Sequence, residues 1–157
     1  MEEKDIYGSY RCQYHGGIRE KAFALIGKIR FMPAATVNDG QPENRILDFN
    51  RLSDGNLYFM TSKGKPTYEQ LCKRPQLVLN TLIDERYSLR LSAWVSETED
   101  QAVWDEFFKL NPGTKEMYRK NFDIVALYKL DRGKERFSIC TPMREYGVCA
   151  LHSAEMR

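Results

Sequence analysis

The alternation of apolar and polar positions predicts strands over most of the chain. Apolar residues recur at every second position or in short continuous runs, which is typical of a domain built mainly from strands. Turn-forming residues join most of the runs, most clearly at 38–40 and 53–56. The first three strands are therefore expected to form a meander of neighbours. We predict seven strands, at residues 31–37, 43–50, 57–62, 76–84, 87–97, 124–131 and 136–140.

A period of about 3.6 residues predicts helices between these strands. The first spans residues 18–29, and its apolar face is expected to carry Ile18, Ala22, Leu25, Ile26 and Ile29. A second helix begins near Pro66, since proline is tolerated at a first helical position. It stops before Pro75, because the residue preceding a proline avoids helical geometry. Cys72, on this helix, is expected to be a core residue.

A third helix is predicted after Thr98, which forms a capping-box pattern with Gln101. Its apolar face carries Val103, Phe107 and Leu110, and Asn111-Pro112-Gly113 ends it. A short fourth helix is predicted at 115–120. Strands joined by tight turns, with a few helices, predict a mainly β (α+β) fold in which an antiparallel, barrel-like sheet is flanked by helices.

Length and charge bound the organisation of the protein. The 157 residues suit one domain, with a core at about 18–140 and extensions at both ends. A net charge of +2, with both signs interspersed, argues against a nucleic-acid-binding protein. No apolar run approaches the roughly 20 residues that span a membrane. The polar, acidic start is not a secretory signal, so we expect a cytoplasmic protein with no membrane partner.

The segment Thr61-Ser62-Lys63-Gly64-Lys65-Pro66 joins a strand to a helix and gathers groups that bind anions. Its hydroxyls and ammonium groups lie beside the free N–H groups and positive dipole end of the helix, as a phosphate requires. A solvated turn rich in Lys and Ser accounts for the same residues, so the segment alone leaves both interpretations open.

Arg45 bears on this choice because its strand is expected beside residues 57–62. Its guanidinium then lies close to Met60–Ser62 and offers a bidentate contact to a phosphate or a carbonyl-rich ring. The alternative is that Arg45 only covers the solvated face of its strand.

Three motifs in this order resemble the pyridoxamine 5′-phosphate oxidase-like family of flavin-binding split β-barrels: ATVNDGQP, LYFMTSKGKPTYEQL and LRLSAWV. The resemblance covers residues 20 to 138, most of one domain. It implies an antiparallel split β-barrel with flanking helices, and a homodimer that holds FMN at the subunit interface.

The resemblance also implies which residues form the cofactor site. Arg45 matches the arginine that faces the flavin, and Lys65 matches the basic residue that binds its phosphate. Ser92 and Trp94 lie on the strand that approaches the partner's flavin. By position, the implied cofactor-binding residues are Arg45, Met60, Thr61, Ser62, Lys63, Lys65 and Gln70.

The sequence departs from the family pattern at Glu43, where relatives often carry a basic residue. A carboxylate beside a phosphate is unfavourable, so Glu43 either points away or belongs to a different kind of pocket. Some members of the family use a deazaflavin or haem, or have no known cofactor. FMN is therefore the expected cofactor, with these alternatives left open.

The function implied by the resemblance is an oxidoreductase that acts on a small molecule through a two-electron flavin cycle. The flavin carries the redox chemistry and the protein binds and tunes it, so the motifs name no catalytic residue. Two alternatives stay open: a non-catalytic protein of the same fold that binds or senses flavin or another cofactor, and a nitro-compound reductase-like protein.

Both histidines follow a cysteine by three residues, as Cys12…His15 and Cys149…His152. Thiolate and imidazole in two close pairs could supply a tetrahedral zinc site. The mixed pairing is uncommon for zinc, so the favoured alternative is that the cysteines pack and the histidines are exposed or face substrate. We therefore predict no metal and retain these four as candidates.

Overall fold

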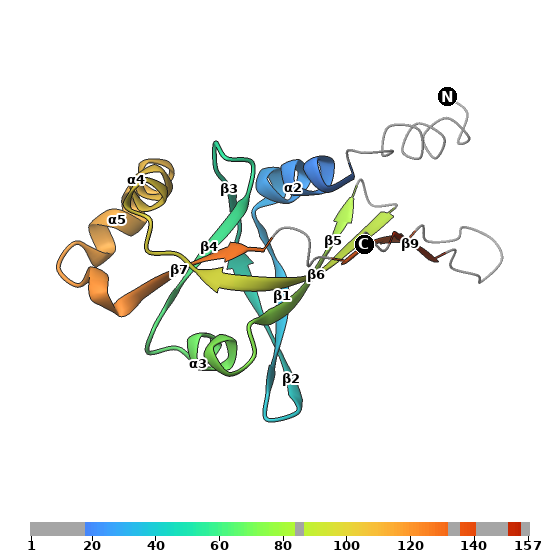
Figure 1. The fold of residues 1–157 in the computed structure, drawn as a ribbon, viewed down its shortest axis with the longest axis horizontal. Coiled ribbons are helices and arrows are strands. Elements are labelled where there is room, and N and C mark those ends of the chain that lie inside the picture. The colour runs from blue at the N-terminus through green and yellow to red at the C-terminus, as the bar shows by residue number, and fades with distance from the viewer. Residues whose placement is uncertain (1–17, 84–86, 132–135, 141–150, 155–157) are drawn as a thin grey trace.

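The computed structural model describes residues 18–83, 87–131, 136–140 and 151–154 (Figure 1). Its helices are α2 (Ile18–Ile29), α3 (Pro66–Lys73), α4 (Gln101–Leu110), α5 (Pro112–Tyr118) and the 3-10 helix η1 (Phe122–Ile124). Its strands are β1 (Phe31–Asn38), β2 (Gln41–Asp48), β3 (Asn50–Arg51), β4 (Leu57–Ser62), β5 (Gln76–Ile83), β6 (Tyr87–Glu97), β7 (Val125–Leu130), β8 (Arg136–Cys140) and β9 (Leu151–Ala154). The seven predicted strands are confirmed, and the short β3 and β9 are additional.

The strands form one antiparallel sheet in the order β2-β1-β5-β6-β7-β4-β3, with β8 joined to β6 and β9 to β8. Only Phe49 separates β2 from β3 in the chain, yet these strands stand at opposite ends of the order. The sheet must therefore curl until its two ends meet, which makes it barrel-like. As a result, β2 faces β4 across a gap between the two ends, which we call the seam.

The predicted meander of the first three strands is wrong in its last step. β1 and β2 do form a hairpin, in which Asp39 (φ 47°) and Gly40 (φ 85°) make the two-residue turn. β4, however, pairs with β3 and β7 and not with β2. The reason is that the chain changes edges at Phe49, which the strand pattern of residues 43–50 does not reveal.

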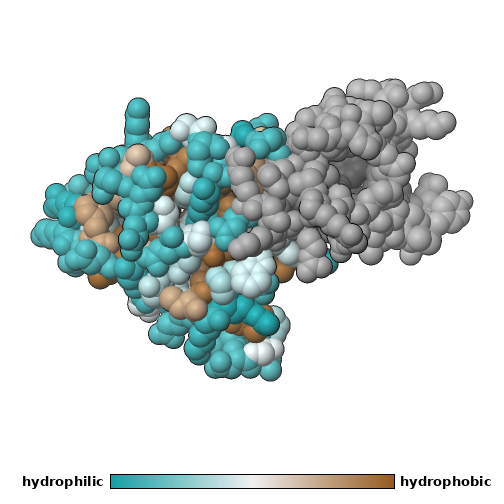
Figure 2. All heavy atoms as spheres, viewed as in Figure 1, coloured by the Kyte–Doolittle hydropathy of each residue, from teal (hydrophilic) through white to brown (hydrophobic). Residues whose placement is uncertain are grey.

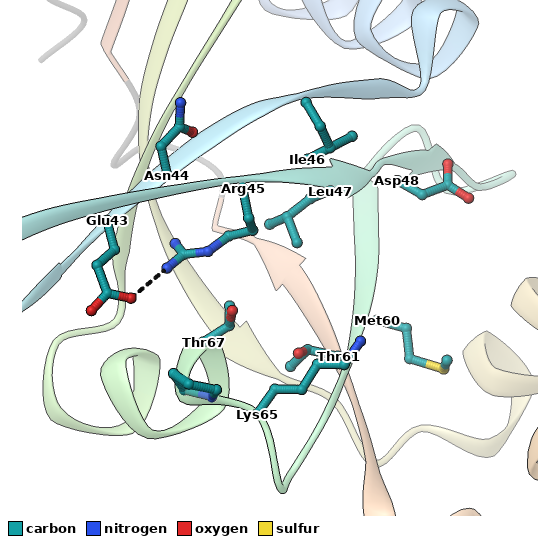
Figure 3. Close-up of a pocket in the computed structure, with 11 residues that line it drawn as sticks. Glu43, Asn44, Arg45, Ile46, Leu47, Asp48, Met60, Thr61, Lys65 and Thr67 are labelled. Atoms are coloured by element: carbon teal, nitrogen blue, oxygen red, sulfur yellow. Dashed lines mark hydrogen bonds and ion pairs between the residues drawn. The ribbon is translucent and has the colours of Figure 1, made fainter.

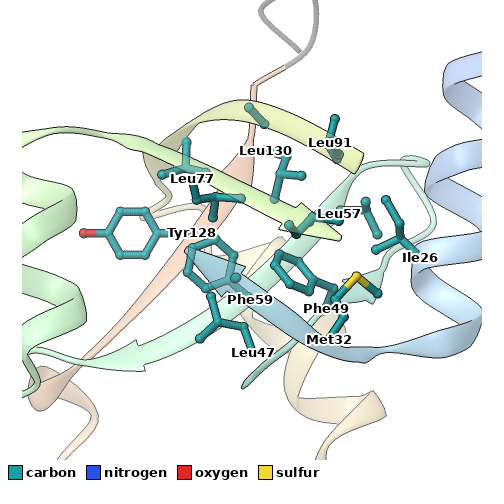
Figure 4. Packing of buried hydrophobic residues seen from close by; sticks show 14 of the residues in the cluster. Ile26, Met32, Leu47, Phe49, Leu57, Phe59, Leu77, Leu91, Tyr128 and Leu130 are labelled. Carbon is teal, nitrogen blue, oxygen red and sulfur yellow. The ribbon is translucent and has the colours of Figure 1, made fainter. Parts of the chain in front are cut away.

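The core lies between the curled sheet and α2 (Figure 4). Alternate strand positions point inward, and Phe49 and Phe59 are fully buried. The ring of Phe59 lies 5.4 Å from that of Phe49 and stacks on Tyr128 at the same distance. Helix α2 contributes Ala22 and Ile26 as predicted, together with Phe23, which the predicted face omitted.

Helix α3 begins at Pro66 and ends before Pro75, as predicted. Its buried side chains are Thr67, Gln70 and Leu71. Cys72 is exposed, so its prediction as a core residue is wrong. It follows Leu71 directly, and a step of about 100° along a helix turns it to the solvent side.

Helix α4 begins later than its capping-box pattern suggests. Thr98 is not its N-cap: the cap is Asp100, whose carboxylate accepts a hydrogen bond from the N–H of Ala102 at 2.9 Å. The helix buries Phe107 as predicted, but its other buried residue is Phe108, while Leu110 is half exposed. Pro112, predicted only to end this helix, also begins α5.

On the face shown in Figure 2, hydrophilic side chains cover most of the described surface and hydrophobic ones form separate patches between them. Among the described residues, no helix has the length and apolar character needed to cross a membrane.

Replacing Phe59 by alanine should destabilise the fold by about 3–5 kcal/mol, because it removes a fully buried ring and leaves a cavity. Met117, which is 75% exposed on α5, is the control: M117A should change stability by less than about 0.5 kcal/mol. Urea unfolding measures both. Similar losses for the two variants would contradict this account of the core.

Candidate functional site

A pocket of about 460 Å³ opens at the seam, between β2 on one side and the corner joining β4 to α3 on the other (Figure 3). Its volume falls within the range of roughly 300–1,000 Å³ that is usual for small-molecule sites. It is lined by Glu43, Asn44, Arg45, Ile46, Leu47, Asp48, Met60, Thr61, Lys65, Pro66 and Thr67.

The structure brings several predicted site residues to this pocket. Arg45, Met60, Thr61 and Lys65 line it. Arg45 lines the same pocket as Met60 and Thr61, as its predicted proximity to them requires. It faces them across the seam, however, and not from a strand paired with β4.

Three other predicted residues lie elsewhere. Ser62 and Lys63 are not part of the lining, and the Lys63 ammonium lies 3.8 Å from the carboxylate of Glu97. Gln70 is buried behind Arg45 and contacts its guanidinium. The contact of these residues with a cofactor remains a prediction.

The corner between β4 and α3 is the cationic end of the pocket. Lys65 is the N-cap of α3, and no side chain caps the helix through a hydrogen bond there. The hydroxyls of Thr61 and Thr67 flank the same point, and both residues are buried. An ammonium, hydroxyls and an uncapped helix N-terminus are together suited to a phosphate.

A polar network fixes Arg45 on the opposite side. Its Nη1 donates to Thr36 Oγ1, and its Nη2 donates to Gln70 Oε1 at 2.8 Å. Thr36 Oγ1 in turn donates to Gln70 Oε1 at 2.5 Å. Since Thr36 and Gln70 are buried, these contacts satisfy polar groups that would otherwise be costly to bury.

Glu43 does not point away from the pocket. Its carboxylate lines it, accepts hydrogen bonds from Gln70 Nε2 (2.7 Å) and Asn38 Nδ2 (2.8 Å), and lies 3.4 Å from Arg45 Nη2. Figure 3 shows the two side chains reaching toward each other from β2. Of the two alternatives that the sequence left open at this position, the structure favours a different kind of pocket.

Hydrogen bonds shift the titration of this carboxylate. Those from Asn38 and Gln70 hold the pKa of Glu43 below its usual value, and the charge of Arg45 acts in the same direction. Burial lowers the pKa of Arg45, against the opposing effect of Glu43. An arginine nevertheless stays charged at neutral pH, because its usual pKa lies above about 12. The two groups therefore form an ion pair.

A second ion pair lines the pocket at Asp48, the last residue of β2. Asp48 receives two hydrogen bonds from Arg30, at 2.9 and 2.6 Å, and Arg30 also donates to Asn111 Oδ1 at 2.8 Å. This arrangement joins the end of β2 to the residue between α4 and α5. The bidentate geometry fixes the carboxylate and takes up its charge.

A second hollow, of about 380 Å³, contains Ser92 and Trp94, which were predicted to approach the partner's flavin. Its walls come from β1, β5 and β6, with Pro42 of β2 and Arg74 at the end of α3. The strand register places both residues on the sheet face away from the core, because Ser92 lies opposite Val78 and Trp94 opposite Gln76.

The candidate metal ligands cannot be placed. Cys12, His15 and Cys149 lie outside the described residues, as does the side chain of His152 in β9. Within the described part of the chain, no three His, Cys, Asp or Glu side chains gather as a metal-binding set.

Thr36 and Asp48 were missed as site residues, and Glu43 was expected only as a departure. One signal was available: Glu43, Arg45 and Leu47 alternate, so they share a face of β2. The side of the sheet on which that face lies depends on the curl of the barrel, which the sequence does not reveal.

Replacing Glu43 by glutamine should reduce the sensitivity of the fold to acid. Because the pKa of Glu43 is lowered on folding, its charge stabilises the protein above the usual value of about 4.3. That contribution is lost as pH falls through the lowered pKa. The melting temperatures of the unchanged protein and E43Q should therefore converge between about pH 6 and pH 3. A constant difference would contradict the assignment.

No protein-family model and no curated protein matches the sequence. Solved structures do match. A NimC/NimA family protein from Clostridium acetobutylicum is 18% identical over 87% of this chain and 92% of its own, with a TM-score of 0.66. A putative pyridoxamine 5′-phosphate oxidase from Listeria innocua is 18% identical over 76% and 97%, with a TM-score of 0.58.

The heme storage protein HutZ from Vibrio cholerae is also similar, at 17% identity over 71% of this chain and 85% of its own, with a TM-score of 0.54. At such identities the similarity concerns the fold alone. A split β-barrel is the fold that the three sequence motifs implied, and it accounts for the curled antiparallel sheet and the flanking helices. The chain thus has the split β-barrel fold of the pyridoxamine 5′-phosphate oxidase-like proteins.

Proposed function

We propose that this protein is an FMN-binding flavoprotein that acts as an oxidoreductase on a small molecule. The observation that carries the proposal is the corner between β4 and α3, where Lys65, two threonine hydroxyls and an uncapped helix N-terminus meet at one end of a pocket of suitable volume. The split barrel supports it, since proteins of this fold include a putative pyridoxamine 5′-phosphate oxidase.

The residues of the pocket fit the two chemical parts of FMN. The phosphate would be held by Lys65, Thr61, Thr67 and the positive end of the α3 dipole. The ring would lie toward β2, where Arg45 is fixed by Thr36 and Gln70. A site whose donors are already held in place loses less entropy on binding.

Bound FMN would supply the two-electron chemistry. The chain's own contribution is to bind, to orient and to place positive charge or hydrogen-bond donors where negative charge develops. Arg45, on the β2 side, is such a group. The similarity to HutZ keeps a second cofactor in view, and the spectrum described below distinguishes heme from flavin.

We also propose that the protein is a homodimer and that the cofactor site lies at its interface. The support is the outer face of the sheet, where Ile46, Val78 and Trp94 are 60%, 39% and 39% exposed. Ala35 and Ser92 lie opposite Val78 on neighbouring strands and share its face. An exposed, largely apolar sheet face of this kind is typical of an interaction surface.

FMN binding tests the first proposal. The purified protein should titrate with FMN and show bound flavin absorption, and a Soret band would indicate heme instead. K65A should weaken FMN binding about 10- to 150-fold, as expected for the loss of a charge-assisted contact worth about 1.5–3 kcal/mol. R45A should also weaken binding.

K109A, which removes an exposed lysine from α4, is the matched control and should bind FMN as the unchanged protein does. Unchanged FMN affinity in both K65A and R45A would refute this site. Bleaching of the bound flavin by NADH or NADPH would support a reductase, and its absence with every donor tried would favour a non-catalytic binding protein.

Light scattering tests the homodimer. The protein should elute with twice its chain mass of 18.4 kDa, and V78E should shift it toward the monomer, because a charge would be buried in the interface. L110E places the same charge on α4 at a residue that is 51% exposed, and it should remain dimeric. A monomer at micromolar concentration, or equal effects of both variants, would contradict the proposal.

A further inference from the structure

Most of the charged side chains that line the seam pocket are paired with an opposite charge. Of its eleven lining residues, Arg45 and Lys65 are cationic, and Glu43 and Asp48 are anionic. Both carboxylates are in ion pairs, Glu43 with Arg45 at 3.4 Å and Asp48 with Arg30 at 2.6 Å. Within the described residues, no ion pair involves Lys65. A ligand therefore meets one uncompensated cation, at the α3 end.

Arg45 is engaged by the protein itself. Nη1 donates to Thr36, while Nη2 faces both Gln70 and Glu43. Thr36 and Gln70 are 3% and 2% exposed, so turning Arg45 toward a ligand would leave buried acceptors without this donor. The network also holds the Glu43 carboxylate in place through Gln70 and Asn38. The negative charge along β2 is thus built into the wall of the pocket.

We infer that Glu43 determines the charge selectivity of this pocket. It neutralises Arg45, so that the pocket binds one anionic group, at Lys65 and the start of α3, and a second anionic group along β2 gains no further attraction. The identification of that ligand with FMN rests on the proposed function. The charge argument itself applies to any anion that enters the pocket.

The physical reason is the repulsion between like charges in a partly enclosed site. A single phosphate at the α3 end meets Lys65 and the helix dipole. A second phosphate would extend toward β2, where Glu43 offsets the attraction of Arg45. Unfavourable placement of like charges is a common basis of discrimination between ligands. A diphosphate should therefore gain little over a monophosphate, despite its greater charge.

Inorganic phosphate and pyrophosphate are suitable probes, because both are small and pyrophosphate adds one anionic phosphoryl group to the first. Calorimetric titration should show that the unchanged protein binds them with similar affinity. In Glu43→Gln, which retains the shape and one acceptor oxygen, pyrophosphate affinity should rise about tenfold and phosphate affinity less. Glu69→Gln removes an equal charge from the exposed side of α3 and should leave both affinities unchanged.

Equal gains for the two anions in Glu43→Gln, or a gain as large in Glu69→Gln, would overturn the inference. A loss of affinity in Glu43→Gln would also overturn it, since Glu43 would then serve to position Arg45 for the anion.

A double variant tests the inference even if Glu43→Gln alone does not fold. The double variant Glu43→Gln/Arg45→Gln removes both members of the ion pair and leaves no charge without a partner. It should bind pyrophosphate within about threefold of the unchanged protein, while Arg45→Gln alone should bind it at least tenfold more weakly. A tenfold loss in the double variant would show that Arg45 acts on the anion despite Glu43, and would overturn the inference.

FMN and riboflavin separate this inference from the proposed function. If the anions behave as expected but FMN does not bind, the charge selectivity stands and the flavin proposal fails. If FMN binds, and binds more tightly than riboflavin, while Glu43→Gln raises phosphate and pyrophosphate affinity equally, the flavin proposal stands and the charge selectivity fails. If neither inorganic anion binds to any of these proteins, the inference is overturned.

Discussion

The fold and the site depend on the single residue that joins β2 to β3. Phe49 links strands that stand at opposite ends of the sheet, so the sheet can hold both only by curling until its ends meet. Its ring is fully buried against Phe59, and its N–H donates to the carbonyl of Arg30 at 2.9 Å, which fixes the crossing point. The two ends are not joined by hydrogen bonds between β2 and β4. The gap left there is the seam, and the pocket lies in it.

Hydrogen bonds between polar side chains hold α3 against β2 across the seam. Gln70 reaches from α3 to Arg45 and Glu43 on β2, while Thr36 on β1 contacts both Arg45 and Gln70. Because two of these side chains are buried, their hydrogen bonds would be expensive to break, and the helix cannot move away from the strand without breaking them. The network that shapes the pocket wall therefore also positions α3, and with it the N-terminus that lies at the pocket. Binding geometry and packing here rest on the same contacts.

The two sides of the pocket are suited to different tasks. The corner at Lys65 is cationic, with Thr61, Thr67 and the uncapped start of α3 beside it. The β2 side carries charges that are already paired, at Glu43 with Arg45 and at Asp48 with Arg30. Proteins that share a split barrel can have different roles, as a heme storage protein and a putative pyridoxamine 5′-phosphate oxidase illustrate. A common fold leaves the ligand to be decided by such details of charge and shape in the pocket wall.

Features that follow local rules could be predicted from the amino-acid sequence. Alternation located the seven strands, Asp39-Gly40 located a hairpin turn, and Pro66 located the start of α3 beside its lysines and threonines. The folded chain was needed to show which strands are neighbours, that β2 meets β4 across the seam, and that Glu43 lines the pocket beside Arg45. It also showed that Cys72 is exposed and that Asp100 caps α4. The physical reason is that turns and periodicity are set by residues close in the chain, whereas the pairing of strands and the side on which a face lies are set by the packing of distant segments around one core.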